Sequence, residues 1–161
     1  IGEGIEKAKM DFGQLECYRF ETELGPVIFA NAFAANDPIS SQYLIDEVRQ
    51  FFSQEEYTSF GIFSFRKDRG ERSQQWLDYL KSGGQEQFSE MLYFGEHSKA
   101  FLRTLREGKV MKGKSPESIT QQVLAFCQGP SLVFGLVNIG GIGTELLGYW
   151  KQAGNKVEGF S

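Results

Sequence analysis

Short, nearly uninterrupted apolar runs alternate with stretches of helical periodicity along the chain, and this alternation limits its possible folds more than any other feature. Runs at 27–33, 58–66 and 131–139 have the composition of strands that are buried on both faces. Strands separated by helices form parallel sheets with the helices packed on their faces. We therefore predict an α/β fold with a mostly parallel sheet covered by helices on both sides.

The N-terminal strand is the candidate exception to parallel pairing. Strands at 15–22 and 27–33 are joined by a turn at Leu24-Gly25-Pro26, which favours an antiparallel first strand. Further strands are predicted at 58–66, 87–94, 110–111 and 131–139. Helices are predicted from residue 38, and at 71–81, 98–106, 116–127 and 144–151.

The helix that begins at Pro38 has the clearest signals. Asp37 is a natural N-cap, and proline suits the first helical position because an N–H there has no intrahelical partner. Apolar residues at helical spacing predict one buried face made of Ile39, Tyr43, Leu44, Val48, Phe51 and Phe52.

The charge and the residue counts argue against several classes of function. The formal net charge is −4, whereas a non-specific nucleic-acid binder needs a cationic surface. His97 is the single histidine, which rules out a metal site built on two or three imidazoles, and we predict no metal site in the chain. Cys17 and Cys127 have neither zinc-site spacing nor the density of a disulfide scaffold.

Ligands of such sheets bind beyond the carboxyl ends of the strands, so the segments that follow strands are the candidate sites. Residues 66–72 hold four cations and two acids, which suit either a bidentate grip on a carboxylate or phosphate or a surface loop with local salt bridges. Asn36 and the following helix start could hold an anion or a nucleotide hydroxyl, although Asp37 equally serves as a plain cap. Residues 138–144 form a glycine-rich turn, and His97 lies near the same edge.

A formal phosphate-loop pattern runs from Gly108 to Ser115, but its context is wrong. A phosphate loop joins a strand to a helix, whereas the segment before Gly108 is charged and helical, and Pro116 disfavours helical dihedrals at Ser115. We predict a helix end, an edge strand and a capped helix instead. The wider stretch 99–114 holds six basic residues and one acid, and it is either a solvated surface or a docking surface for another domain or an anionic partner.

Four segments, in order, resemble one family: GQLECYRFE at 13–21, ANAFAANDPISS at 30–41, SFRKDRGERSQQW at 64–76 and LVFGLVNIGG at 132–141. They are similar to the C-terminal domain of the ligase subunit of poly-γ-glutamate synthase, the CapB or PgsB family of the Mur ligase superfamily. FAAND and the arginine-rich pattern that ends in Gln-Gln are the most specific parts. The resemblance implies one Rossmann-like domain over 1–161, excised from a larger ligase, with 1–12 as a linker or the end of the preceding domain.

The resemblance also implies an activity. Mur-type ligases phosphorylate a carboxylate with ATP and magnesium, and an amine then attacks the acyl phosphate; in this family both partners are glutamate, joined through the γ-carboxyl. ATP and magnesium would bind mainly to an upstream domain of the same protein. This chain would close over the nucleotide and hold glutamate and poly-γ-glutamate, with no catalytic residue assigned to it. The whole protein is expected at the cytoplasmic face, associated with the membrane and its synthase subunits, and this fragment is expected to be soluble.

By position, the family's substrate contacts fall on Arg66, Asp68, Arg69 and Arg72, and its nucleotide contacts fall on Asn36, Asp37, Asn138 and Gly140. Arg69 is expected to be the most sensitive cation, with Asp68 orienting it or binding a hydroxyl itself. The chain departs from other branches at Ala34 and Ala35, where they carry His or Lys, and at Gly140-Gly141. A stand-alone Rossmann-like nucleotide-binding module, or a protein-interaction module without catalysis, is the alternative.

The rejected phosphate loop gives a first prediction. The purified chain alone should hydrolyse no ATP. In the complete enzyme, the double change Gly113→Ala, Lys114→Ala should leave the ligase activity within a few-fold of the parent's. A loss of roughly 10³-fold, about 4 kcal/mol of transition-state stabilisation, would show that this loop binds phosphate after all.

Overall fold

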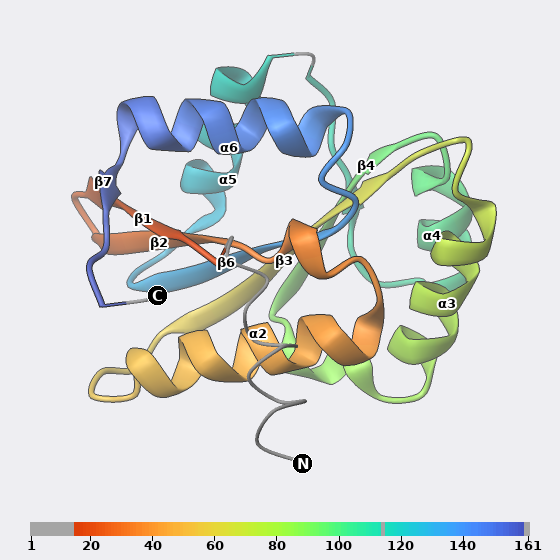
Figure 1. The fold of residues 1–161 in the computed structure, drawn as a ribbon, viewed down its shortest axis with the longest axis horizontal. Helices are drawn as coiled ribbons and strands as arrows, with labels where there is room; N and C mark the ends of the chain where they lie inside the picture. Colours follow the sequence, from red (N-terminus) through yellow and green to blue (C-terminus); the bar gives the residue numbers. More distant parts are fainter. Residues whose placement is uncertain (1–14, 114, 160–161) are drawn as a thin grey trace, which may run out of the picture.

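A computed structural model describes residues 15–113 and 115–159, in which seven strands form one sheet in the order β5-β4-β3-β6-β2-β1-β7 (Figure 1). The strands are β1 (Cys17–Thr22), β2 (Gly25–Asn31), β3 (Thr58–Phe65), β4 (Glu90–Gly95), β5 (Lys109–Val110), β6 (Ser131–Val137) and β7 (Asn155–Lys156). The five strands from β5 to β2 pair in parallel, whereas β1 pairs antiparallel with both β2 and β7. The predicted mostly parallel sheet and the antiparallel N-terminal strand are both confirmed.

Helices cover both faces of the sheet, as predicted. They are α2 (Pro38–Phe51), α3 (Gly70–Lys81), α4 (Ser98–Leu105), α5 (Pro116–Phe126) and α6 (Ile142–Ala153), with short 3-10 helices η1 (Phe33–Ala35) and η2 (Gly84–Gln87). The side chains of α2, α3 and α4 pack on one face, and those of α5 and α6 on the other (Figure 1). The central strand β6 is therefore buried along its whole length, as a doubly covered parallel strand must be.

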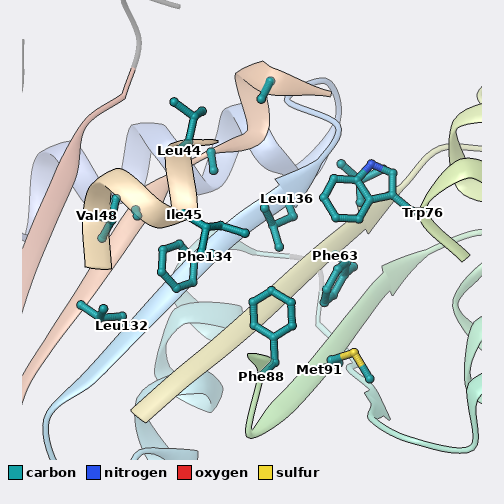
Figure 2. Close-up of a cluster of buried hydrophobic side chains, with 14 of the residues drawn as sticks. Leu44, Ile45, Val48, Phe63, Trp76, Phe88, Met91, Leu132, Phe134 and Leu136 are labelled. Carbon is teal, nitrogen blue, oxygen red and sulfur yellow. The ribbon is translucent and has the colours of Figure 1, made fainter. Parts of the chain in front are cut away.

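The larger core lies under α2, α3 and α4. Figure 2 shows its members from α2, β3, α3, η2's C-cap, β4 and β6: Leu44, Ile45, Val48, Phe63, Trp76, Phe88, Met91, Leu132, Phe134 and Leu136. Full burial of a side chain of this size contributes about 1.5–3 kcal/mol. Aromatic rings supply much of the volume, and Phe63 contacts Trp76 edge-on with ring centres 5.9 Å apart.

The predicted apolar face of α2 is only half right. Three of its residues are buried, namely Leu44, Val48 and Phe52, and three are exposed, namely Ile39 (70%), Tyr43 (40%) and Phe51 (44%). The helix instead turns Pro38, Ser41 and Ile45 toward the sheet. Because a small polar residue can fill a place against the sheet, hydrophobicity alone misplaced the buried stripe.

The segment with the phosphate-loop pattern has the predicted structure. The helix α4 ends at Leu105, β5 forms an edge strand, and the Ser115 hydroxyl caps α5 by accepting from the N–H of Ser118 at 3.1 Å. Lys114 and the predicted linker at 1–12 lie outside the described residues. Within the described ranges, helices of the length and apolarity needed to cross a membrane are absent.

Glu16 connects β1, β7 and α6 at the antiparallel side of the sheet. Its carboxylate accepts a hydrogen bond from Tyr18 Oη at 2.7 Å, and it lies 3.3 Å from Lys156 Nζ and 3.6 Å from Lys151 Nζ. Burial alone would raise the pKa of Glu16, but the Tyr18 hydrogen bond and the two ammonium groups lower this pKa overall. A carboxyl whose pKa falls on folding stabilises the fold while it is ionised.

We predict that Glu16→Gln lowers the free energy of unfolding at neutral pH by about 1 kcal/mol, the scale of a part-exposed ion pair with one hydrogen bond. The stabilisation is present above the unfolded pKa of 4.5 and is lost as the pH falls through the lower folded value. Urea unfolding of the variant and the parent should therefore converge in acid. The control is Glu21→Gln, at an exposed carboxylate 3.4 Å from Arg19, which should change the free energy of unfolding little. If Glu16→Gln lowered the free energy of unfolding equally at acidic and neutral pH, the role assigned to the Glu16 carboxylate would be wrong.

Candidate functional site

The strands β3 and β6 are neighbours in the sheet, and the chain leaves them toward opposite faces (Figure 1). The connection after β3 leads to α3 on one face, and the connection after β6 leads to α6 on the opposite face. Ligands of α/β sheets bind at such a switch point, beyond the carboxyl ends of the strands. Residues 66–72 and the turn at 138–141 contact each other there, so the structure brings together two of the predicted segments.

Asn138 joins the two sides of the switch point. Its side chain is buried; Nδ2 donates to the carbonyl of Ser64 at 3.0 Å, and Oδ1 accepts from Nη1 of Arg72 at 2.5 Å. Both ends of the amide are thus bonded inside the protein. This geometry gives Asn138 a positioning role for Arg72, while its contact with a nucleotide stays a prediction.

The candidate residues before α2 are also bonded internally. Asp37 Oδ1 accepts from the N–H of Ser40 at 2.8 Å, so the capping alternative is confirmed for Asp37. Asn36 has a left-handed backbone (φ 62°), and its carbonyl accepts from Trp76 Nε1 at 2.7 Å. The amide orientation that satisfies its neighbours places the Asn36 side-chain nitrogen 3.3 Å from the carbonyl oxygen of Val137. Asn36 therefore connects the start of α2 to α3 and to the end of β6.

The turn after β6 has two unusual features. Val137 has φ 85°, a costly conformation for a β-branched residue that persists only where the surroundings fix it, and such residues cluster at functional sites. At Gly140, a Cβ atom would lie only 2.5 Å from Arg66 Nη1. The absence of a side chain at Gly140 thus lets the Arg66 guanidinium lie against the turn.

The three arginines of 66–72 differ in what holds them. Arg66 forms a two-bond fork with Asp68, from Nε to Oδ1 at 3.0 Å and from Nη2 to Oδ2 at 2.8 Å. Arg72 is half-buried against Asn138. Arg69 is exposed, and within 15–113 and 115–159 its side chain has neither a hydrogen bond nor an ion pair. The expectation that Asp68 orients Arg69 is wrong, because the Asp68 carboxylate is bonded to Arg66.

The charges at this edge favour an anionic ligand. Burial lowers the pKa of Arg72, and the nearby charges of Arg69 and Arg66 lower it further, while Asp37 and Asp68 act in the opposite direction. Three cations and two carboxylates within electrostatic range leave one excess positive charge. A bound carboxylate or phosphate would relieve the repulsion among the arginines.

Sequence reasoning missed a contact between the first turn of α3 and His97. Ser73 Oγ donates to the Arg69 carbonyl at 3.3 Å and lies 2.8 Å from Nδ1 of His97. A hydroxyl has one proton, so an Oγ that donates to Arg69 accepts a hydrogen bond from Nδ1–H. The available signal was the position of Ser73 inside the arginine-rich pattern, four residues after Arg69.

A separate cavity lies at the start of β4, lined in part by Glu86, Glu90 and Glu107. Its carboxylates would repel the anionic ligands that the arginines attract, so this cavity is not the candidate site. In the described part of the chain, no three His, Cys, Asp or Glu side chains come together as metal ligands.

A family model described as the poly-gamma-glutamate synthase CapB C-terminal domain matches residues 17–153. The chain belongs to this family. The match to the CapB C-terminal domain extends from β1 to the end of α6 and includes every candidate residue between Asn36 and Gly140. Capsule biosynthesis protein CapB of Bacillus anthracis is 25% identical over 155 residues, which make up 89% of this chain and 32% of that protein. The chain thus spans about a third of the length of this relative. No solved structure matches the chain.

We predict that neutral His97 in this CapB C-terminal domain is the Nδ1–H tautomer, which is the less common form of free imidazole. The chain has one histidine, so ¹⁵N-detected NMR of the imidazole reports this site alone. Ser73→Ala should abolish the preference and lower the free energy of unfolding by about 1 kcal/mol.

Two further variants make the test sharper. Asparagine can place its amide N–H near the position of Nδ1, whereas glutamine reaches toward that of Nε2. His97→Asn should therefore retain most of the stability that His97→Gln loses. An Nε2–H tautomer in the parent chain would contradict the hydrogen-bond assignment.

Proposed function

We propose that this chain is the substrate-positioning C-terminal domain of a Mur-type, ATP-dependent amide ligase that joins glutamate units through the γ-carboxyl. Its family membership supports the proposal, and so does its similarity to a protein named for capsule biosynthesis. One observation carries it: at the switch point, Arg69 is exposed and lacks a side-chain partner among the described residues, while Arg66 and Arg72 are held by Asp68 and Asn138.

The proposed reaction has two steps. The γ-carboxylate of one glutamate takes the terminal phosphoryl group of ATP, which gives an acyl phosphate and ADP. The amine of a second glutamate attacks the acyl carbon, phosphate leaves, and the amine nitrogen loses a proton to give the amide. Neither step needs a nucleophile from the protein, so the contribution of the protein is placement and charge stabilisation.

The residues of this chain suit the placement of glutamate. An arginine binds a carboxylate through two parallel N–H···O bonds, which fix direction as well as distance. Arg69 would make this contact with a carboxylate that does not react. The Arg66–Asp68 fork and the Arg72–Asn138 bond hold the backbone on either side, so the Arg69 side chain is presented from a fixed loop.

ATP and magnesium belong, in this proposal, mainly to an upstream domain of the longer protein. The residues described here assemble no metal-ligand set, so no step is assigned to magnesium on this chain. Asn36, Asp37, Asn138 and Gly140 would line the wall that closes over the nucleotide. Association of the whole protein with the membrane and with synthase subunits is part of the same proposal.

We predict that Arg69→Lys in the full-length ligase lowers kcat/KM for glutamate by roughly tenfold or more, because lysine cannot reproduce the two-bond contact and losing a positioned charge pair costs about 2–5 kcal/mol. Arg69→Ala should lower it further. Thermal stability should barely change, because the Arg69 side chain is exposed and has neither a hydrogen bond nor an ion pair in the described residues.

Lys81→Ala, at an exposed cation at the other end of α3, is the matched control and should leave glutamate-dependent ATP turnover unchanged. Full activity of Arg69→Ala, or its failure to fold, would make the loop structural and the site assignment wrong. Absence of glutamate-dependent ATP turnover in the active full-length protein would favour the alternative of a binding or interaction module.

A further inference from the structure

The stretch 99–114 has no role in the proposed site, although it dominates the charge distribution. Its six basic residues and one acid give it a formal charge of +5 in a chain of −4, so the remaining residues together carry −9. A cationic segment on an otherwise acidic domain concentrates the attraction for anions in one place.

The helix α4 arranges its cations on a single face. Lys99 and Arg103 are four residues apart, which places them on one side of the helix, and Arg106 follows as its C-cap; all three are exposed. The opposite side carries the buried Ser98, Phe101 and Leu105. The side that carries Lys99 and Arg103 therefore points away from the sheet and extends over about 6 Å of helix length.

These cations are not neutralised by the protein. Across 15–113 and 115–159, Lys99, Arg103, Arg106, Lys109 and Lys112 lack an ion-pair partner within 4.0 Å and are exposed. Lys109 of β5 lies apart from the α4 cations, because its Nζ sits 4.9 Å from the centre of the Phe126 ring of α5, on the opposite side of the sheet from α4. The basic face is therefore made of Lys99, Arg103 and Arg106.

The basic face begins next to residues 66–72, which carry the three arginines of the candidate site. His97 immediately precedes α4, and its imidazole contacts Ser73 in the first turn of α3, the helix whose N-cap is Arg69. From this contact α4 runs back over the sheet, away from the carboxyl ends of the parallel strands (Figure 1), and it carries Lys99 and Arg103 with Arg106 at its end. A polymer held at Arg69 could follow α4 without crossing an acidic surface of that helix.

We propose that the basic face is a secondary binding surface for the poly-γ-glutamate chain, and this inference rests on the proposed function. Each unit of that polymer leaves one α-carboxylate free, so the product is a flexible polyanion with evenly spaced charges. A line of exposed, unneutralised cations leading from the site complements such a chain. Its effect would be to retain a long acceptor near the site between successive additions.

Two other anionic partners fit the observations less well. Single-stranded nucleic acids stack their bases on exposed aromatic rings, and membrane-surface helices insert apolar side chains. Of the described residues, the exposed large hydrophobics are Leu24, Ile39, Tyr43 and Phe51, and none of them lies on α4 or β5. The basic face offers charge alone, which suits a soluble polyanion.

The first test measures binding of fluorescently labelled poly-γ-glutamate to the purified chain by anisotropy, over a series of salt concentrations. The triple change Lys99→Gln, Arg103→Gln, Arg106→Gln should weaken binding at low salt on the order of tenfold and flatten its salt dependence. The matched control, Arg19→Gln, Lys81→Gln, Lys151→Gln, removes three exposed or part-exposed cations on other elements. Equal weakening by both triples, or no binding by the parent, would overturn the proposal.

Competitors identify the partner class. Unlabelled poly-γ-glutamate should displace the probe, whereas free glutamate at the same carboxylate concentration should not. Tighter binding of oligo(dT) or of phosphatidylglycerol vesicles than of the polymer would overturn the proposal in favour of a nucleic acid or a membrane surface. Thermal unfolding of both triples confirms that they fold.

The second test separates this inference from the proposed function. In the full-length protein, the basic-face triple should ligate a single glutamate acceptor normally and should lose the preference for a long acceptor over a short one. An unchanged preference would contradict the basic face while leaving the ligase proposal intact. Absence of ligation by the parent protein would contradict the ligase proposal. The binding experiment on the purified chain would then still decide whether the basic face binds the polymer.

Discussion

Parallel strands expose two apolar faces, and burying both requires helices on both sides of the sheet. The chain meets this requirement by placing α2, α3 and α4 on one face and α5 and α6 on the other. It must therefore change sides once, and the returning strand β6 is inserted between β3 and β2. The switch point at the carboxyl ends of β3 and β6 is a consequence of this solution to a burial problem, and the candidate site lies there.

Buried and part-buried hydrogen bonds join the segments at this switch point. A desolvated amide that loses its partners costs about 1–3 kcal/mol, so the Asn138 side chain holds Ser64 and Arg72 at fixed positions. The indole N–H of Trp76 does the same for the carbonyl of Asn36. These bonds connect three segments that are far apart in the sequence, and they leave the Arg69 side chain exposed.

Local patterns were sufficient to predict the order of the strands and helices. Caps at Asp37 and Ser115, and the apolar composition of β6, are signals contained in a few neighbouring residues. The two-residue strand β7 was missed, because it depends on pairing with β1 at Tyr18 and Arg19 rather than on its own composition. The buried face of α2 was misplaced because Ser41 and Pro38 occupy positions that hydrophobicity assigned to larger residues.

The site was predictable as a set of segments and not as a set of contacts. Topology brings the ends of parallel strands to one edge, so 66–72 and 138–141 could be expected to meet. The bond between Arg72 and Asn138 joins residues 66 positions apart, and no local spacing indicates it. The Arg66–Asp68 fork involves near neighbours, but choosing Arg66 over Arg69 as the partner of Asp68 requires the backbone of the loop.

Gly140 couples two distant parts of the sequence at this edge of the sheet. A single methyl group there would occupy the place of the Arg66 guanidinium, because the two atoms would be 2.5 Å apart. A side chain at position 140 would therefore displace the end of the Arg66 side chain, which is long enough to move aside. Two positions that are 74 residues apart in sequence are thus coupled through space, and a bulkier residue in the turn would disturb the fork between Arg66 and Asp68.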